Sequence, residues 1–145
     1  MKNLIFIITF IVVSINAFSQ SLDNKYVALY GKVRNNAGML YGIFENGGQE
    51  TIGSAGWDSG VKGSTNYQLV GNIKDKNGFW FCIRKDLIDK TFYVGNVVNN
   101  VGYYYEVSKA KGIRQLQNQT WGTCWEGEKI AWEMGQNGFW ICMKK

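Results

Sequence analysis

The sequence predicts an all-β, antiparallel protein of about ten short strands, arranged as two tandem five-stranded repeats. Three observations predict this fold class. The chain has no proline and no long apolar segment with a helical period. Short apolar runs alternate with clusters of Asn, Gly and charged residues, which is typical of strands joined by tight turns. The segment Asn77–Lys85 also returns near the end of the chain, with most positions identical, as Asn137–Lys145.

A second match extends the repeat upstream. The segment Gly31–Gly38 resembles Gly95–Gly102, and the similarity continues as far as Trp57 and Trp121. We therefore expect repeat 1 to cover residues 26–85 and repeat 2 to cover residues 90–145. Relative to repeat 2, repeat 1 carries three extra residues near positions 59–65 and one near positions 74–76, where loops are expected.

Each repeat contains five segments with strand-like composition. In repeat 1 the expected strands are Tyr26–Val33, Met39–Phe44, Glu50–Gly53, Gln68–Ile73 and Phe79–Lys85. In repeat 2 they are Thr91–Val98, Tyr103–Ser108, Arg114–Gln117, Lys129–Met134 and Phe139–Lys144. Asn and Gly tolerate positive φ, so the Asn-Asn-x-Gly and Asn-Gly pairs between these segments predict hairpins.

Alternation along the strands assigns one apolar face to each repeat. Its expected core positions are Met39, Tyr41, Ile43, Leu69, Ile73, Phe79, Phe81, Ile83, Tyr103, Tyr105, Val107, Ile130, Trp132, Met134, Phe139, Ile141 and Met143. A ten-stranded sheet with one apolar face must close on itself or fold over. The sequence leaves two arrangements open: a closed barrel, or two packed sheets with pseudo-two-fold symmetry.

The first nineteen residues have the layout of a secretory signal peptide. Lys2 precedes an apolar run, and small residues, Ala17 and Ser19, stand where a signal peptidase reads. Cleavage after Ser19 would leave residues 20–145 as a single all-β domain without stable membrane insertion. We expect this domain to be secreted, in a periplasm, on a cell surface or outside the cell.

The composition argues against several functional classes. The chain has no histidine, so triads with an imidazole base and His-ligated metal sites are excluded, and we expect no metal and no cofactor. No carboxylate is shared by the two repeats, and we expect no enzymatic activity. The net charge is +5, but the basic residues are scattered, which argues against a nucleic-acid partner. Export favours a disulfide, and one bond is expected among Cys82, Cys124 and Cys142 without a preferred pairing.

Aromatic residues make up 15% of the chain and supply the candidate sites. The two loops around Trp57 and Trp121 place an indole among small and polar residues, a pattern suited to stacking on a sugar ring. The expected ligand-binding residues are Trp57, Asp58, Ser59, Trp121, Thr123, Trp125 and Glu126. The alternative is that Trp57 and Trp121 fold back and plug an end of the structure.

A second candidate surface lies on the side of the last strand opposite to the core. Trp80 with Arg84, and Trp140 with Lys144, alternate onto that side in the two repeats. Exposed rings beside cations would form an interaction surface. The alternative is that this face is also covered.

These features predict a non-catalytic binding protein with two similar sites, whose partner is a glycan. The alternatives are a protein-interaction or structural envelope protein, such as an inhibitor or adhesin, and a carrier of a small apolar ligand. The sequence indicates no oligomeric state.

Overall fold

The computed structural model describes residues 24–60 and 66–145, which form ten β-strands and one turn of 3-10 helix, η1 (Lys85–Leu87). The expected signal peptide lies outside the described residues. One set of strands is β1 (Ala28–Arg34), β2 (Ala37–Ile43), β3 (Gln49–Ser54), β4 (Tyr67–Ile73) and β5 (Phe79–Arg84). The other set is β6 (Phe92–Val98), β7 (Val101–Ser108), β8 (Gly112–Gln115), β9 (Glu128–Glu133) and β10 (Phe139–Met143). The all-β prediction is confirmed.

A turn of two asparagines joins the first two strands of each half. Asn35 and Asn36 have φ of 50° and 68°, and Asn99 and Asn100 have φ of 49° and 69°. Two successive left-handed residues join strands whose twist matches the turn, and asparagine adopts this conformation more readily than most residues. Because the turns are only two residues long, β2 and β7 begin two residues earlier than the sequence predicts.

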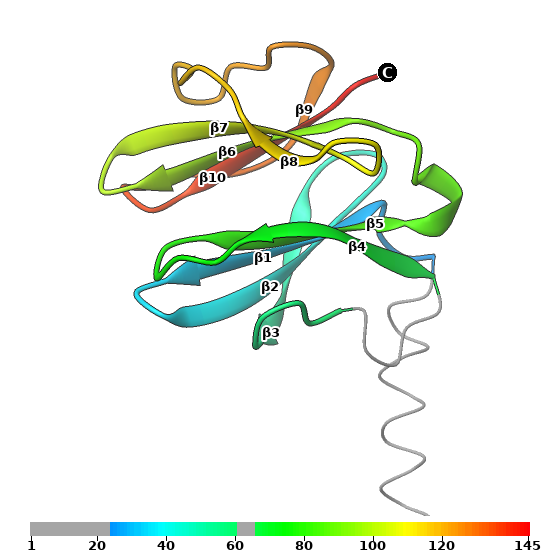
Figure 1. Cartoon of the computed structure of the whole chain (residues 1–145), viewed down its shortest axis with the longest axis horizontal. Coiled ribbons are helices and arrows are strands. Elements are labelled where there is room, and N and C mark those ends of the chain that lie inside the picture. The colour runs from blue at the N-terminus through cyan, green and yellow to red at the C-terminus, as the bar shows by residue number, and fades with distance from the viewer. Residues whose placement is uncertain (1–23, 61–65) are drawn as a thin grey trace, which may run out of the picture.

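The strands pair in two five-stranded antiparallel sheets, with the orders β3-β2-β1-β5-β4 and β8-β7-β6-β10-β9. Figure 1 shows the sheets as two layers. The register is also shared: Tyr30 pairs with Tyr41 and Phe81, and Val94 pairs with Tyr105 and Ile141. We call two residues corresponding when they hold the same register position in the two sheets.

The sheets remain separate within the described residues, where no strand ladder joins one to the other. The structure therefore shows two sheets and not a closed barrel. At one edge they nevertheless meet, since the Gly48 amide donates to the Ile130 carbonyl at 2.6 Å. At the opposite edge, Gly71 on β4 lies against Ile113 on β8.

A single hydrophobic core fills the space between the two sheets. Aromatic rings meet across it, with centroids 4.7 Å apart for Tyr30 and Phe139 and 5.2 Å apart for Phe81 and Phe92. Most predicted core positions contribute to it: Met39, Tyr41, Ile43, Ile73, Phe79, Phe81, Ile83, Tyr103, Tyr105, Val107, Ile130, Phe139, Ile141 and Met143.

Three predicted core positions are wrong, and all lie on or just after β4 and β9. Leu69 packs on the opposite side of its sheet, while Trp132 and Met134 are 46% and 72% exposed. The cause is a bulge in each strand, where the ladder shifts register beside Val70 in β4 and beside Ile130 in β9. An extra residue reverses the alternation beyond it, which a strict period of two does not anticipate.

The predicted extra residue near positions 74–76 is also wrong. Ile73 pairs with Phe79, and Glu133 pairs with Phe139, so both hairpins have the same length. Ile73 and Glu133 are therefore corresponding residues. The whole length difference between the halves lies before β4.

Polar side chains from the two sheets meet inside the core. Lys32 on β1 is 1% exposed and corresponds to Asn96 on β6. Its ammonium group donates to the side-chain oxygen of Asn96 and, at 3.1 Å, to the Val97 carbonyl. The Tyr30 hydroxyl donates to the same Asn96 oxygen at 3.2 Å. Burial, and secondarily the charge of Arg34, lower the pKa of Lys32 to about 7.

Candidate functional site

The outer face of each sheet carries a buried tryptophan. Trp80 and Trp140 are 0% exposed. Each indole lies directly over a glycine of the neighbouring strand: a Cβ on Gly31 would be 1.9 Å from the Trp80 ring, and one on Gly95 would be 2.2 Å from the Trp140 ring. The face that carries Trp80 and Trp140 is therefore covered, as the alternative interpretation of the sequence expects. Neither ring is available as a surface contact.

The cations predicted beside these rings have other partners. Arg84 has a side chain only 11% exposed, which pairs with Asp86 at 2.7 Å. Lys144 pairs with Glu126 at 2.8 Å. The predicted interaction surface is thus not assembled as a row of exposed ring and cation.

The two predicted ligand loops form the cover over these rings. The Trp80 indole donates to the Ser59 carbonyl at 2.8 Å, and the Trp140 indole donates to the Thr123 carbonyl at 2.9 Å. Trp57 packs on Trp80 with centroids 5.6 Å apart, and Trp121 packs on Trp140 at 5.9 Å. Ser59 and Thr123 therefore act through backbone atoms that hold the loops in place.

Both loop tryptophans keep part of their surface open. Trp57 is 37% exposed, and Trp121 is half-buried. Each ring packs against a buried tryptophan and keeps part of its surface exposed. A ring held in this way loses little conformational entropy when a ligand stacks on it.

The second sheet adds an exposed aromatic group beside its loop. The Lys129 ammonium lies 5.5 Å from the centroid of Trp121 and 5.0 Å from that of Trp132, which is 46% exposed. We call Trp121, Lys129 and Trp132 the aromatic surface. Sequence reasoning missed Lys129 and Trp132, because the bulge in β9 turns outward a tryptophan that alternation places in the core.

The first sheet is different at the corresponding positions. Leu69 and Asn72 replace Lys129 and Trp132. The Asn72 amide donates to the Asp58 carboxylate at 2.9 Å, and Asp58 has a φ of 62°. The Ser59 hydroxyl is turned to the Gly56 carbonyl at 2.7 Å. The first sheet therefore presents one open ring with polar neighbours.

A disulfide fastens the covering loop of the second sheet. Cys124 and Cys142 are bonded, while Cys82 is a buried free thiol whose pKa burial raises to about 12. Cys82 corresponds to Cys142, but no cysteine stands in its loop to pair with it. The sequence left the pairing open.

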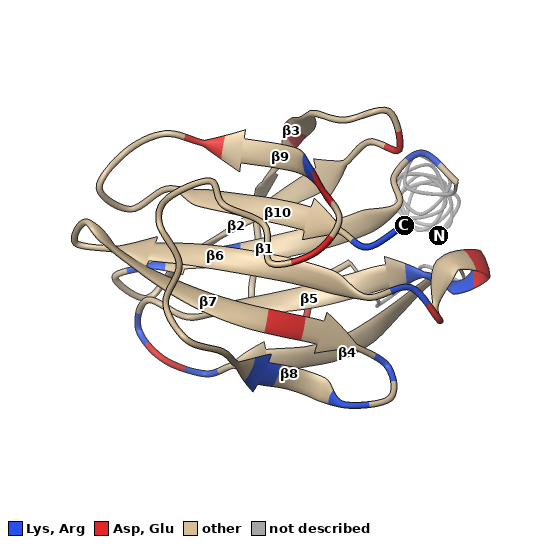
Figure 2. Cartoon of the chain, turned by 90° about the horizontal axis from the view of Figure 1, so that it is seen from above, with Lys and Arg blue, Asp and Glu red and all other residues tan. Residues whose placement is uncertain are grey.

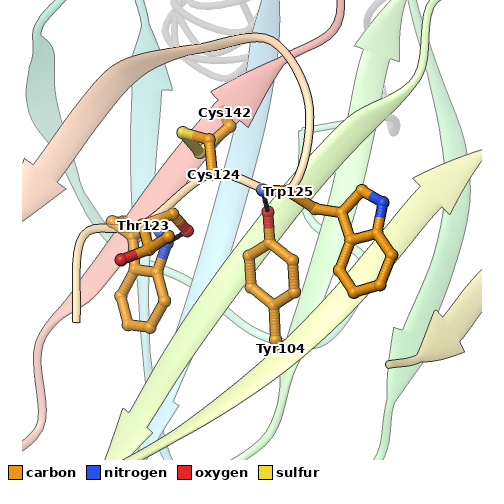
Figure 3. The surroundings of a disulfide bond; sticks show 6 residues. Tyr104, Thr123, Cys124, Trp125 and Cys142 are labelled. Carbon is orange, nitrogen blue, oxygen red and sulfur yellow. Dashed lines mark hydrogen bonds between the residues drawn. A yellow bond between two sulfur atoms is a disulfide. The ribbon is translucent and has the colours of Figure 1, made fainter. Parts of the chain in front are cut away.

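The remaining predicted residues, Trp125 and Glu126, follow the disulfide. The Trp125 amide donates to the Tyr104 hydroxyl at 2.8 Å, and Figure 3 shows this bond beside Cys124 and Cys142. The Trp125 ring is 58% exposed. Glu126 also accepts a 3.5 Å hydrogen bond from Tyr93, and its ion pair with Lys144 lowers its carboxyl pKa. These contacts fix the loop and leave the Trp125 ring open.

Charge does not concentrate at one place in the described part of the chain. Figure 2 shows Lys and Arg spread over loops on several sides, interspersed with Asp and Glu. Among residues 24–60 and 66–145, no three His, Cys, Asp or Glu side chains converge as metal ligands. The same residues contain no helix with the length and hydropathy needed to span a membrane.

No known protein-family model matches this chain, and no curated protein and no solved structure matches it. The site and its geometry therefore supply the argument for function.

Proposed function

We propose that this chain is a secreted, non-catalytic binding protein that recognises a glycan, with its principal site at the aromatic surface of the second sheet. The observation that carries the proposal is the pair of partly exposed indoles, Trp121 and Trp132, with the Lys129 ammonium over both rings. Trp121 is backed by buried Trp140 and Trp132 lies on a strand, so neither ring needs a large rearrangement to bind.

The chemistry of this surface suits a sugar. Indole rings offer flat apolar platforms for the C–H face of a pyranose, and polar groups at their edge bind hydroxyls. The ammonium of Lys129 adds a positive charge at the centre of the platform. Its presence favours an acidic sugar, such as a uronic acid or a sulfated residue.

The proposal includes an origin by duplication. The shared strand order and register of the two sheets support pseudo-two-fold symmetry and two related sites. The first site, around Trp57, is the weaker one, because Asn72 stands where the second site has Trp132. Two linked sites on one polymer raise the apparent affinity without any new contact.

Secretion is part of the same proposal. The apolar N-terminal run has the layout of an export signal, and the Cys124–Cys142 bond suits an oxidising compartment.

A polysaccharide-binding assay tests the proposal. Residues 20–145 are applied to an array that pairs acidic with neutral glycans, as wild type, Trp132→Ala, Lys129→Gln and Trp57→Ala. Loss of one stacked ring is expected to weaken binding about tenfold or more. Lys129→Gln should weaken the binding of the acidic glycans and leave the binding of the neutral glycans unchanged. Met134→Ala, which removes a 72% exposed apolar side chain outside the surface, is the matched control.

Two outcomes would overturn the glycan proposal: a wild type that binds no glycan, or binding that Trp132→Ala leaves unchanged. A wild type that captures a defined envelope protein through Trp132 would instead support the protein-interaction class.

A further inference from the structure

The two ends of the core differ at one set of corresponding residues. Around Tyr41, the space between the sheets is filled by an ion pair from this chain. Arg34 donates to the Tyr41 hydroxyl at 3.1 Å, to the Asn137 carbonyl at 3.0 Å, and to Glu133, with which it forms the pair. The Tyr41 hydroxyl also lies 3.4 Å from both Glu133 oxygens.

Around Tyr105, which corresponds to Tyr41, that ion pair is missing. Val98 corresponds to Arg34, and Ile73 corresponds to Glu133. In place of the two long charged side chains there is a cavity of about 400 Å³. Its lining includes these two residues together with Tyr105, Asp75, Asn77 and Asn96.

One polar group of the cavity, the Tyr105 hydroxyl, lacks the partner that its counterpart Tyr41 has. Tyr105 is 8% exposed, yet none of the described residues hydrogen-bonds to its hydroxyl. This hydroxyl borders the cavity, so its hydrogen bonding is left to solvent or to a ligand. Burial, the neighbouring Tyr103 and the charge of Asp75 together raise the pKa of Tyr105, so this hydroxyl stays protonated at neutral pH.

The cavity lining carries an acidic side chain. Asp75 is the one charged residue in its described lining, and no Lys or Arg of the described chain pairs with it. The amine of Lys32 in the core is turned to Asn96 and Val97. Asn77 corresponds to Asn137, whose carbonyl accepts from Arg34. In this half the Asn77 carbonyl instead accepts from the Asn96 amide at 3.1 Å, so it is already paired.

From this comparison we propose that the cavity binds a guanidinium group, the side chain of an arginine supplied by a ligand. The group would take the place that Arg34 occupies in the other half. Its planar N–H donors match the Tyr105 hydroxyl and the Asp75 carboxylate, and its methylene chain would pack on Val98 and Ile73. The site is separate from the aromatic surface, and its test does not depend on glycan binding.

The test is a titration followed by two-dimensional NMR of residues 20–145. The probes are free L-arginine, the same residue within a Gly-Arg-Gly peptide, and L-citrulline, which keeps the shape of arginine but carries no charge. We expect arginine to shift the methyl signals of Val98 and Ile73, with citrulline at least tenfold weaker. A tighter fit of the peptide than of the free amino acid would identify a polypeptide as the source, and the reverse would identify a metabolite.

Variants locate the binding. Asp75→Asn should weaken arginine about tenfold and Tyr105→Phe about threefold to tenfold, while Asp89→Asn, which removes a charge elsewhere, should have no effect. The pair Val98→Arg with Ile73→Glu rebuilds the ion pair of the other half and should abolish binding by filling the cavity. Equal affinity for citrulline, shifts confined to other residues, absence of binding, or unchanged affinity in Asp75→Asn would each overturn the proposal. If the double variant fails to fold, the affinities of Asp75→Asn and Tyr105→Phe for arginine still test the proposal.

Discussion

At the scale of single residues, glycine decides whether the outer face of each sheet can be covered. Gly31 and Gly95 lie under the rings of Trp80 and Trp140, where any side chain would overlap the indole. The ring is fixed from above by its hydrogen bond to the loop and by the loop tryptophan. It therefore cannot move aside without breaking the cover.

We predict that Gly31→Ala and Gly95→Ala each destabilise the protein by about 2–3 kcal/mol or more, because the added methyl group overpacks a site with no free volume. Urea unfolding followed by tryptophan fluorescence measures the change. Gly56→Ala is the matched control, since nothing lies within 4 Å of a Cβ at that position. A change below about 0.5 kcal/mol in both glycine variants would mean that the rings are not held as described.

At the scale of elements, the two covering loops are held by different means. Both receive an indole hydrogen bond and pack a second tryptophan on the first. The loop of the second sheet is additionally tied to β10 by the Cys124–Cys142 bond. Cys82 on β5 has no such partner and is buried, so its thiol is protected in the native state.

We predict that the Cys124→Ala, Cys142→Ala double variant loses about 2–3 kcal/mol of unfolding free energy, as expected for a cross-link that closes a loop of 18 residues. Hydrogen exchange should increase in the loop before β9, while β6 and β7 remain protected. Alkylation under denaturing conditions checks the bond itself. The unreduced wild type should gain one adduct, at Cys82, and the reduced protein should gain three. Three adducts without reduction would contradict the pairing.

The sequence predicts those features of the elements that depend on local residues, and it does not predict those that depend on pairing between strands. The strands and hairpins were predictable, because asparagine turns and alternating apolar residues such as Phe79 and Phe81 are local signals. The bulges beside Val70 and Ile130 were not, because a bulge depends on pairing with the neighbouring strand. The candidate site depends on such a bulge. Trp57 and Trp121 were found from their loops, whereas Trp132 and Lys129 required the register.

At the scale of the whole molecule, the two sheets are joined by a core with one buried amine. Lys32 contacts Asn96 and Val97 on the opposite sheet, and no described carboxylate forms an ion pair with it. A lysine without a counter-ion is more stable neutral in this position. Its protonation therefore couples the packing of the two sheets to pH.

We predict that the unfolding free energy rises with pH between about 7 and 9. The folded pKa of Lys32 is about 7, against an ordinary lysine value of 10.5. In this range the unfolded chain therefore holds a proton that the folded chain has released. Stability must then increase with pH, by at most about 1.4 kcal/mol per pH unit. Below pH 7 both states are protonated and this dependence disappears. Above pH 9 the Cys82 thiol, and later Tyr30, begin to ionise in the unfolded state, which opposes the rise because burial raises both pKa values in the folded protein.

Urea unfolding at pH 6.5, 7.5, 8.5 and 9 measures this dependence. Lys32→Met keeps the length of the side chain without the amine, so the variant should lose the increase above pH 7 and become more stable than the wild type at the acidic end. Lys74→Met is the control, because it removes a lysine from the exposed turn after β4 and should retain the wild-type slope. A slope that survives in Lys32→Met would assign the pH dependence to another group. It would also show that the interior between the sheets accommodates a charged amine, and thus that the amine does not oppose their packing.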